Sequence, residues 1–355
     1  MLKLKNIYKD KNILITGHTG FKGSWLTLWL LTLGAKVTGI SDKKHGLFTI
    51  FEILNNPKNL KNYFFDIKNK NKLRKIFKKH KFDYIFHLAA QPLVKESIKK
   101  PLETFETNIF GLINILENLK NTKRKIKVVI VTTDKVYEND ETNKKFREND
   151  KLGGNDPYSA SKAAKEIILN SYFKSFYSYS NNILICSARA GNVIGGGDWS
   201  NDRIIPDIIR SIISKKKLVI RNPLATRPWQ YVLETVYGYL LLGQKLNKRL
   251  TGNSFNFGPN NDKKISVLDI SKYINKKGLK FNYKIIKEKK KIKSKFLALN
   301  SQKVSKIIHW KTILSQKQAI NFTIDWYKYL IINKYNRQKI LEFSTRQILD
   351  YNDRL

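Results

Sequence analysis

KNILITGHTGFKGSW, residues 11–25, places a glycine-rich turn between a short apolar run and a segment with helical apolar periodicity. Residues 11–16 predict a strand, and residues 25–33 predict a helix. Gly17, Gly20 and Gly23 occupy positions one, four and seven of the turn. This spacing permits a tight turn and lets the backbone approach a pyrophosphate at the positive N-terminus of the helix. The stretch therefore predicts a dinucleotide-binding strand, loop and helix, and a plain strand-to-helix turn is the alternative interpretation.

The segments that follow continue the alternation of strands and helices. Their connections are short, which is typical of a parallel sheet covered by helices on both faces. We therefore predict an α/β fold: a Rossmann-type doubly wound parallel sheet with a smaller C-terminal substrate-binding lobe. The expected strands lie at residues 36–40, 62–65, 84–88, 127–132 and 182–187, and the expected helices lie at residues 70–79, 101–119 and 158–177.

The alternation loosens after about residue 190, where glycine, proline and aromatic residues occupy long connections at 195–199 and 221–229. We expect a dinucleotide-binding Rossmann domain over residues 1–190 and a mainly substrate-binding lobe over residues 191–355. The segment near residues 231–245 is expected to pack back on the first domain.

Composition excludes several classes of protein. The 355 residues are 41% apolar and 12% aromatic, enough for one large two-lobed unit or two closely joined domains. The longest apolar stretches, such as residues 25–33 and 237–242, are shorter than the roughly 20 residues that a membrane helix needs. The basic N-terminus runs directly into the first predicted strand, without the apolar core of a signal peptide. We expect a soluble cytoplasmic protein that does not associate with membranes.

Lysine plus arginine number 68 against 28 aspartates and glutamates, a formal charge of +40. Such an excess is typical of nucleic-acid-binding proteins. The basic residues are nevertheless spread over the whole chain, and runs such as residues 287–291 are interpreted as solvated surface, so we expect no nucleic-acid partner. Cys186 is the only cysteine and is expected to be an inert buried thiol. Because the five histidines are scattered, we expect neither a disulfide nor a metal site.

Tyr158 and Lys162 form a Y-x-x-x-K pattern at the start of a predicted helix. At this spacing the two side chains lie on one helix face, where the ammonium group is expected to lower the pKa of the phenol. A phenolate there can take a proton from a sugar hydroxyl while hydride leaves the same carbon for a nicotinamide. Thr133 follows a predicted strand and can hydrogen-bond the same hydroxyl. Asp42 follows the second strand and favours NAD, although Lys43 and Lys44 are compatible with the 2′-phosphate of NADP.

Longer motifs resemble those of CDP-glucose 4,6-dehydratases, which are extended short-chain dehydrogenases/reductases, and the resemblance covers nearly the whole chain. The G-x-x-G-x-x-G form of the turn is typical of the extended class. Lys22 and Lys135 discriminate best, because relatives that act on dTDP-glucose typically have Asp-Glu where this chain has Asp134-Lys135. The motifs are GHTGFKGSW at 17–25, TDK at 133–135, YSASK at 158–162, GNVIGGGDW at 191–199, RNP at 221–223 and RPWQ at 227–230.

The resemblance implies NAD as cofactor and conversion of CDP-glucose to CDP-4-keto-6-deoxy-D-glucose plus water. It also implies a homodimer built on the helices predicted at 101–119 and 158–177, which carry apolar residues on more than one face. The implied cofactor contacts are Gly17, Thr19, Gly20, Phe21, Lys22, Gly23, Asp42, Asp66, Ile67, Leu88, Ala89, Ala90, Tyr158 and Lys162. The implied substrate contacts are Gln91, Asn192, Arg203, Arg221 and Arg227. For Asp66, a helix cap is the alternative interpretation.

The catalytic set that the resemblance implies is Thr133, Asp134, Lys135, Tyr158 and Lys162. Thr133 would orient the C4 hydroxyl, Tyr158 would be the base, and Asp134 would protonate the C6 hydroxyl that leaves once C4 is a ketone. Lys135 would remove the C5 proton, yet two adjacent opposite charges favour the wrong protonation states for this step. Burial could outweigh the pairing, the side chains could point apart, or Lys135 could stay cationic and stabilise the enolate.

Three other functions compete with this one: an epimerase or dehydratase for another nucleotide sugar, a non-catalytic NAD-binding regulatory protein, and a nucleic-acid-binding protein. An epimerase needs no acid for a leaving hydroxyl, and a regulatory protein is expected to lack Tyr158 or Lys162. Two features depart from the family pattern: the basic segment 287–295 and Asn300, which replaces an aspartate. They leave the details of the C-terminal nucleotide pocket open.

Overall fold

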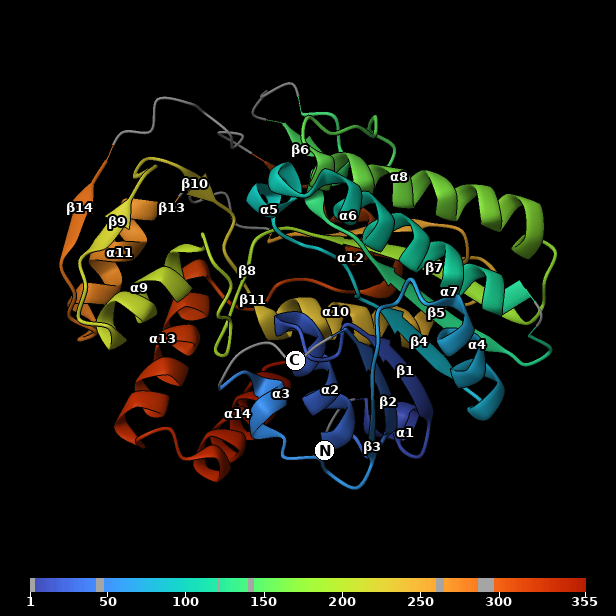
Figure 1. Cartoon of the computed structure of the whole chain (residues 1–355), viewed down its shortest axis with the longest axis horizontal. Helices are drawn as coiled ribbons and strands as arrows, with labels where there is room; N and C mark the ends of the chain where they lie inside the picture. The colour runs from blue at the N-terminus through green and yellow to red at the C-terminus, as the bar shows by residue number, and fades with distance from the viewer. Residues whose placement is uncertain (1–3, 43–47, 121, 140–143, 260–264, 287–296) are drawn as a thin grey trace.

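The structure is a computed structural model that describes residues 4–42, 48–120, 122–139, 144–259, 265–286 and 297–355 (Figure 1). Lys43, Lys44 and the basic segment 287–295 lie outside these residues. At the centre is a seven-stranded sheet in the order β12-β7-β5-β4-β1-β2-β3, and all neighbouring pairs are parallel. The strands are β1 (Asn12–Thr16), β2 (Lys36–Ser41), β3 (Leu60–Phe64), β4 (Tyr84–His87), β5 (Ile126–Val131), β7 (Ile183–Ala190) and β12 (Ser254–Phe257).

Helices cover both faces of this sheet (Figure 1). Successive residues of a strand point to opposite faces, so Ile13 and Ile15 pack under one helical layer and Leu14 under the other. The first layer contains α2 (Phe21–Thr32) and α10 (Val232–Lys245), and the second contains α4 (Lys70–Lys79), α7 (Gly111–Lys120) and α8 (Pro157–Tyr172). The arrangement confirms the predicted doubly wound α/β fold.

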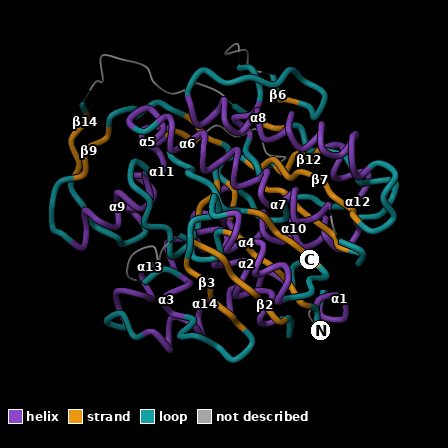
Figure 2. The backbone as a smooth tube through the Cα atoms, turned by 45° about the vertical axis from the view of Figure 1, so that its right-hand side comes forward, coloured by secondary structure: helices purple, strands orange, loops and turns teal. Residues whose placement is uncertain are grey.

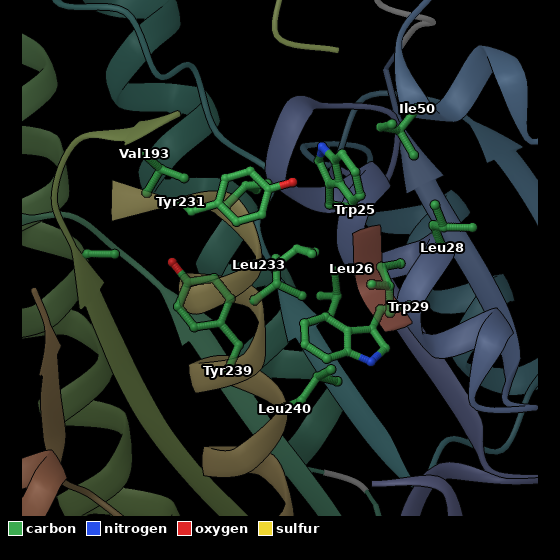
Figure 3. Close-up of a cluster of buried hydrophobic side chains, with 14 of the residues drawn as sticks. Trp25, Leu26, Leu28, Trp29, Ile50, Val193, Tyr231, Leu233, Tyr239 and Leu240 are labelled. Atoms are coloured by element: carbon green, nitrogen blue, oxygen red, sulfur yellow. The ribbon is translucent and has the colours of Figure 1, made fainter. Parts of the chain in front are cut away.

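The packing of α2 against α10 forms the centre of the larger core (Figure 3). Trp25 and Trp29 of α2 are buried together with Leu233 and Leu240 of α10. The indole Nε1 of Trp25 donates to the carbonyl of Gly196 at 2.9 Å, which satisfies its only donor. Residues from the two halves of the chain therefore share one core.

The C-terminal half adds short paired strands and several helices beside the sheet (Figures 1 and 2). The strands are β8 (Val193–Ile194), β9 (Leu218–Ile220), β10 (Thr226–Arg227), β11 (Gln230–Tyr231), β13 (Ile265–Ser266), β14 (Tyr283–Ile285) and β15 (Ala298–Leu299), the last paired with β6 (Lys145–Phe146). The helices are α9 (Ile204–Ile213), α11 (Val267–Lys276), α12 (Gln302–Ile308), α13 (Gln316–Ile332) and α14 (Arg337–Asn352).

The remaining helices are short: α1 (Lys5–Tyr8), α3 (Ile50–Ile53) and α5 (Val94–Lys99). None of the described helices combines the length and the apolar character needed to cross a membrane. Cys186 is buried in β7, and burial raises the pKa of its thiol.

Two predicted helices are not continuous α-helices. The one predicted at 101–119 consists of α6 (Pro101–Phe105), a π-helical turn (Glu106–Phe110) and α7, and α8 ends at Tyr172 before a second π-helical turn (Phe173–Tyr177). In the first π-turn, the buried side chain of Asn108 donates to the carbonyl of Gln91 and to the hydroxyl of Ser161. These tertiary contacts occur at the π-helical turn, where the helix is locally wider. The periodicity of apolar residues in the sequence does not indicate them.

Glu234 joins α10 to the segment that precedes α13. Its carboxylate, 1% exposed, accepts hydrogen bonds from the backbone amides of Ile313 and Leu314 at 2.8 and 2.9 Å. Burial raises the pKa of Glu234 to about 7. Between the pKa of a glutamate in an unfolded chain, about 4.3, and this higher value, the folded protein holds a proton that the unfolded chain lacks. Raising the pH through this interval therefore lowers stability.

We predict that Glu234→Gln removes this part of the pH dependence, because a neutral amide keeps an oxygen that can accept both backbone hydrogen bonds. Relative to the variant, the wild type should lose roughly 3 kcal/mol of unfolding free energy between about pH 5 and pH 8. Urea unfolding of both proteins across this range measures the difference. Since all other titrating groups are common to the two proteins, parallel pH profiles would contradict the assignment.

Candidate active site

The glycine-rich loop between β1 and α2 is shaped by contacts that leave no room for side chains. Gly17 has a φ of +76°, and a Cβ there would lie 2.8 Å from the amide nitrogen of Ala89. A Cβ on Gly23 would lie 2.1 Å from the carbonyl oxygen of Gly17. Both positions therefore require glycine, and the loop folds as tightly as the sequence predicts.

The N-terminus of α2 opens into a cavity beside this loop. Gly20 is the N-cap and supplies no side-chain acceptor, and the first amide of the helix with a helical backbone acceptor is that of Ser24. Helix N-termini with free amides attract phosphate groups because the amides and the helix dipole are both positive. Phe21, Lys22 and Gly23 line the cavity at this end. These features fit the pyrophosphate of a dinucleotide.

The cavity, of about 1040 Å³, is lined by all but one of the residues expected to bind cofactor or substrate or to act in catalysis. The exception is Thr19, which is fully buried and whose amide donates to the hydroxyl of Ser41 at 3.3 Å. Thr19 thus supports the loop from behind. Among the described residues, no cluster of His, Cys, Asp and Glu side chains could hold a metal ion.

The adenosine end of the cavity contains Asp42, just after β2, together with Asp66 and Ile67, just after β3. One carboxylate oxygen of Asp66 accepts the amide of Lys68 at 2.8 Å. The helix that follows is capped by Asn69, so Asp66 stabilises a turn and does not cap α4. Its second oxygen lies 3.6 Å from the ammonium group of Lys68.

The catalytic candidates meet where β5 ends against the start of α8. Thr133, Asp134 and Lys135 lie just after β5, separated from it by Thr132. Helix α8 begins after Asp156, whose side chain accepts the amide of Ser159, and Pro157 occupies its first turn. This start places Tyr158 in the first turn and Lys162 one turn later, with its Nζ 5.8 Å from the centre of the tyrosine ring.

The expected lowering of the pKa of Tyr158 by Lys162 is not found among the described residues. Burial raises the pKa of Tyr158 to about 12, and an interaction with the side chain of Thr133 lowers it only in part. Lys162 is itself buried, and burial together with the nearby charges of Lys165 and Lys22 holds its pKa well below the ordinary value. Desolvation has the largest effect because Tyr158 is only 8% exposed, so its charged phenolate form would be shielded from water.

Asp134 is buried, with 4% of its surface exposed. Its Oδ1 accepts a hydrogen bond from the hydroxyl of Thr133 at 2.9 Å, and its Oδ2 has no hydrogen-bond partner among the described residues. Burial raises the pKa of Asp134, although the charge of Lys135 and the hydrogen bond from Thr133 act in the opposite direction. One of the alternatives for Asp134 and Lys135 was that burial outweighs the attraction between the two charges. The direction of the pKa shift of Asp134 favours this alternative.

Two charged residues near this centre were not expected there. Lys22, in the glycine-rich loop, extends to the hydroxyl of Tyr239 at 3.4 Å, and burial and Arg203 lower its pKa to about 8. Glu166 lies one turn beyond Lys162 and forms a buried ion pair of 3.0 Å with Arg189. An acidic residue four positions after Lys162 in an apolar helix is the one sequence signal that could have indicated Glu166.

The substrate candidates of the C-terminal half also line the cavity. Arg203 pairs with Asp198 at 3.0 Å, and Arg221 pairs with Asp202 at 2.6 Å. Arg227 is half-buried, and burial lowers its pKa while the charge of Asp134 raises it. Asn192 also lines the cavity, and its backbone carbonyl oxygen accepts a hydrogen bond from the amide of Gln230.

Gln91 lines the cavity, but its side-chain amide makes hydrogen bonds within its own neighbourhood. It donates to the carbonyl of Leu93 and the hydroxyl of Thr104, and it accepts the amide of Leu93. These contacts shape the loop after β4. A direct role of Gln91 in substrate binding stays a prediction.

Comparisons with known proteins agree with this geometry. The family model described as GDP-mannose 4,6 dehydratase matches residues 14–323. A CDP-glucose 4,6-dehydratase from Salmonella typhimurium is 36% identical over 354 residues, covering 98% of each chain. Among solved structures, the epimerase Mth375 from Methanothermobacter thermautotrophicus has a TM-score of 0.80 at 22% identity and covers 94% of this chain and 97% of its own. A dTDP-glucose 4,6-dehydratase from Bacillus anthracis, in complex with NAD, has a TM-score of 0.76 at 24% identity. The match covers 90% of this chain and 96% of the Bacillus chain.

The fold and the site define a short-chain dehydrogenase/reductase of the extended epimerase and dehydratase class. Within that class, the chain belongs to the GDP-mannose 4,6 dehydratase family, as the match over most of its length shows. Its full-length similarity to the Salmonella enzyme agrees with the resemblance found in the sequence motifs.

We predict that Gly23→Ala and Gly20→Ala separate folding of the loop from cofactor binding. A methyl group on Gly23 collides with backbone, so this variant should lose roughly 1–3 kcal/mol of stability in the absence of ligand. A methyl group on Gly20 meets its nearest atom at 3.4 Å, so this variant should unfold near the wild-type temperature but bind a dinucleotide less tightly. Thermal unfolding and calorimetric titration with NAD measure the two effects. Equal stability of the two variants would contradict the geometric argument.

Proposed function

We propose that this chain is an NAD-dependent CDP-glucose 4,6-dehydratase, a lyase that forms CDP-4-keto-6-deoxy-D-glucose and water. The observation that carries the proposal is the convergence of Thr133, Asp134, Lys135 and Tyr158 on one cavity that also contains the glycine-rich loop. The full-length similarity to the Salmonella enzyme supports the same activity.

The residues at the cavity fit NAD. The free amides at the start of α2 would hold the pyrophosphate, the carboxylate of Asp42 would accept the ribose hydroxyls, and Asp66 and Ile67 would contact the adenine. When bound, NAD supplies a hydride acceptor that takes the hydrogen of C4 and returns it to C6. The cofactor is regenerated in each turnover, so tight binding is an advantage.

The arginines of the C-terminal half fit an anionic sugar nucleotide. Guanidinium groups suit the diphosphate because they present fixed pairs of donors, and Arg203, Arg221 and Arg227 all line the cavity. CDP-glucose is favoured over other nucleotide sugars by Lys22 and Lys135, the two positions that distinguish this type of dehydratase from relatives that act on dTDP-glucose.

The proposed roles of the catalytic residues are those that the family resemblance implies, and the shared position of these residues at the cavity supports them. The hydroxyl of Thr133 orients the C4 oxygen, and Tyr158 receives its proton. The ketone then makes the C5 hydrogen acidic, and Asp134 supplies a proton to the departing C6 hydroxyl. Lys135 either removes the C5 proton or stabilises the enolate as a cation. A related epimerase would not need Asp134, which makes this residue the main argument for a dehydratase.

A cytoplasmic homodimer completes the proposal. The helices α6, α7 and α8 lie side by side (Figure 1). Large apolar side chains are exposed on these helices and on the π-helical turns that adjoin them. Leu102 is 71% exposed and Ile167 is 59% exposed, and Phe110 and Phe176 are also exposed. Apolar surface gathered on neighbouring helices is typical of an isologous interface around a two-fold axis.

To test the activity, the purified protein is incubated with CDP-glucose, dTDP-glucose, UDP-glucose and GDP-mannose, and the loss of water is followed by mass spectrometry. We predict that CDP-glucose is turned over with a kcat/KM at least about 100-fold above the others, which is a discrimination of ordinary size between related substrates. Preferred turnover of another nucleotide sugar would contradict the assignment. Interconversion of sugar epimers without water loss would favour the epimerase.

To test the dimer, Leu102 and Ile167 are both replaced by lysine. Burying two ammonium groups in an apolar interface is costly, so we predict a monomer by light scattering at micromolar concentration, whereas the wild type is a dimer. Leu224→Lys is the matched control, because Leu224 is 82% exposed but lies outside these helices. A wild type that is monomeric, or a double variant that remains dimeric, would exclude this interface.

A further inference from the structure

Asp202, in the loop that precedes α9, has a carboxylate that is held through one oxygen only. Its Oδ1 accepts a hydrogen bond from the ammonium group of Lys95 at 2.9 Å and another from the guanidinium group of Arg221 at 2.6 Å. Every hydrogen bond that this carboxylate makes with the described residues falls on Oδ1. All three residues line the cavity. The second oxygen, Oδ2, is therefore left to accept a hydrogen bond from a bound molecule.

The two ion pairs orient Asp202 more than they stabilise the fold. Lys95 belongs to α5 in the N-terminal half, whereas Arg221 follows β9 in the C-terminal half. The side chains of Lys95, Asp202 and Arg221 are 30%, 33% and 44% exposed, and ion pairs exposed to this extent contribute little to stability. Partial burial by itself would raise the pKa of Asp202, but the hydrogen bonds and charges of its two partners lower it overall. The carboxylate thus stays ionised and can only accept hydrogen bonds.

The charges around the catalytic residues indicate where Asp202 lies along the cavity. The charge of Arg203 acts on Tyr158, and that of Arg227 acts on Asp134. Among the described residues, neither Asp202 nor its two partners supplies one of the main charges that act on these catalytic residues. The diphosphate of a sugar nucleotide is bonded directly to the sugar, so it suits the two arginines near the catalytic centre. The nucleoside beyond it would extend toward Asp202, which directly precedes Arg203 in the chain.

Apolar side chains near Arg221 supply surface that a flat base can contact. Val219 and Ile220 of β9 precede Arg221, and Ala225 and Val267 lie near the end of the loop that follows it. All four apolar residues line the cavity. The amide of Val267 donates to the carbonyl of Ala225 at 3.0 Å, which fixes the loop to the start of α11. An apolar lining with a few fixed polar groups is typical of a ligand pocket.

We propose that Asp202 distinguishes among pyrimidine bases, with its Oδ2 accepting a hydrogen bond from the amino group of cytosine. This inference rests on the proposed function and extends it to selection of the base. Cytosine has an amino donor at position 4, whereas uracil and thymine have an acceptor oxygen at the same position. An ionised carboxylate therefore binds cytosine and repels the other two bases.

The test measures the binding of CDP and UDP by calorimetry in the presence of saturating NAD. The wild type should bind CDP about tenfold more tightly than UDP. In Asp202→Asn, the amide oxygen should stay with Lys95 and Arg221, which can only donate, so the amide nitrogen should face the base as a donor. The variant should bind UDP at least as tightly as CDP. Asparagine also tolerates the φ of +60° at this position, so the backbone should be unchanged.

Asp207→Asn is the matched control. Asp207 also lines the cavity, and its carboxylate pairs with Arg210 of the same helix. This substitution removes the same charge, so it reports any general effect of lost negative charge on nucleotide binding. Its preference for CDP should equal that of the wild type. If Asp202→Asn changes the affinities for CDP and UDP equally, the carboxylate acts on the phosphates or ribose that both share, and the proposal is overturned.

A modified nucleotide tests the hydrogen bond without relying on a variant. N4,N4-dimethyl-CDP keeps the ring, ribose and phosphates of CDP but has no N–H at position 4. The wild type should bind it about tenfold less tightly than CDP. The loss should be smaller in Asp202→Asn, because the steric cost of the methyl groups is common to both proteins. Equal binding of CDP and its dimethyl derivative by the wild type would overturn the proposal, even where Asp202→Asn fails to fold.

These outcomes separate base recognition from the proposed function. A wild type that turns over CDP-glucose, combined with an unchanged preference for CDP in Asp202→Asn, would contradict base recognition by Asp202 alone. A wild type that prefers UDP to CDP and turns over UDP-glucose would contradict the proposed substrate and this inference with it.

Discussion

The buried ion pair between Arg189 and Glu166 fixes the catalytic helix to the end of the sheet. Arg189 is in β7 and donates to both carboxylate oxygens of Glu166 at 3.0 Å, and Thr132 at the end of β5 donates to the same carboxylate. Two desolvated charges are tolerated only where such matched hydrogen bonds satisfy them. Because Glu166 lies one turn from Lys162 and two turns from Tyr158, the ion pair determines how α8 stands against β5. The geometry of catalysis thus depends on Arg189 and Glu166, which are not among the residues that line the cavity.

Where the determinants are local, the sequence was sufficient. At Gly23 the constraint is local, because the backbone of Gly17 leaves no room for a side chain, whereas the constraint on Gly17 comes from Ala89, which is distant in the sequence. The bounds of α4 agree with the prediction for the same reason, since its apolar stripe and its Asn69 cap are adjacent in the chain. The π-turn at Glu106–Phe110 could not be predicted, because it accompanies tertiary hydrogen bonds of Asn108.

Electrostatic states were the least predictable part of the site. Spacing places Lys162 beside Tyr158, but it does not reveal that burial outweighs the attraction between them. Sequence position assigns Lys22 to the dinucleotide loop, whereas its side chain extends toward Tyr239 and is influenced by Asp134. In both cases the deciding quantity is the amount of water excluded by residues far away in the sequence. A sequence motif therefore identifies the groups that form the site, whereas the protonation states of these groups depend on the folded structure around them.

The burial of Asp134 bears on the conflict between the adjacent residues Asp134 and Lys135. Burial raises the pKa of Asp134, whereas the charge of Lys135 and the hydrogen bond from Thr133 act in the opposite direction. Thr133 holds Oδ1 of the carboxyl group, and Oδ2 has no hydrogen-bond partner among the described residues. A residue that is proposed to protonate a departing hydroxyl needs a raised pKa and one oxygen that can reach the substrate. Both properties come from the fold around Asp134, so its suitability as an acid depends on burial more than on the residue that follows it in the sequence.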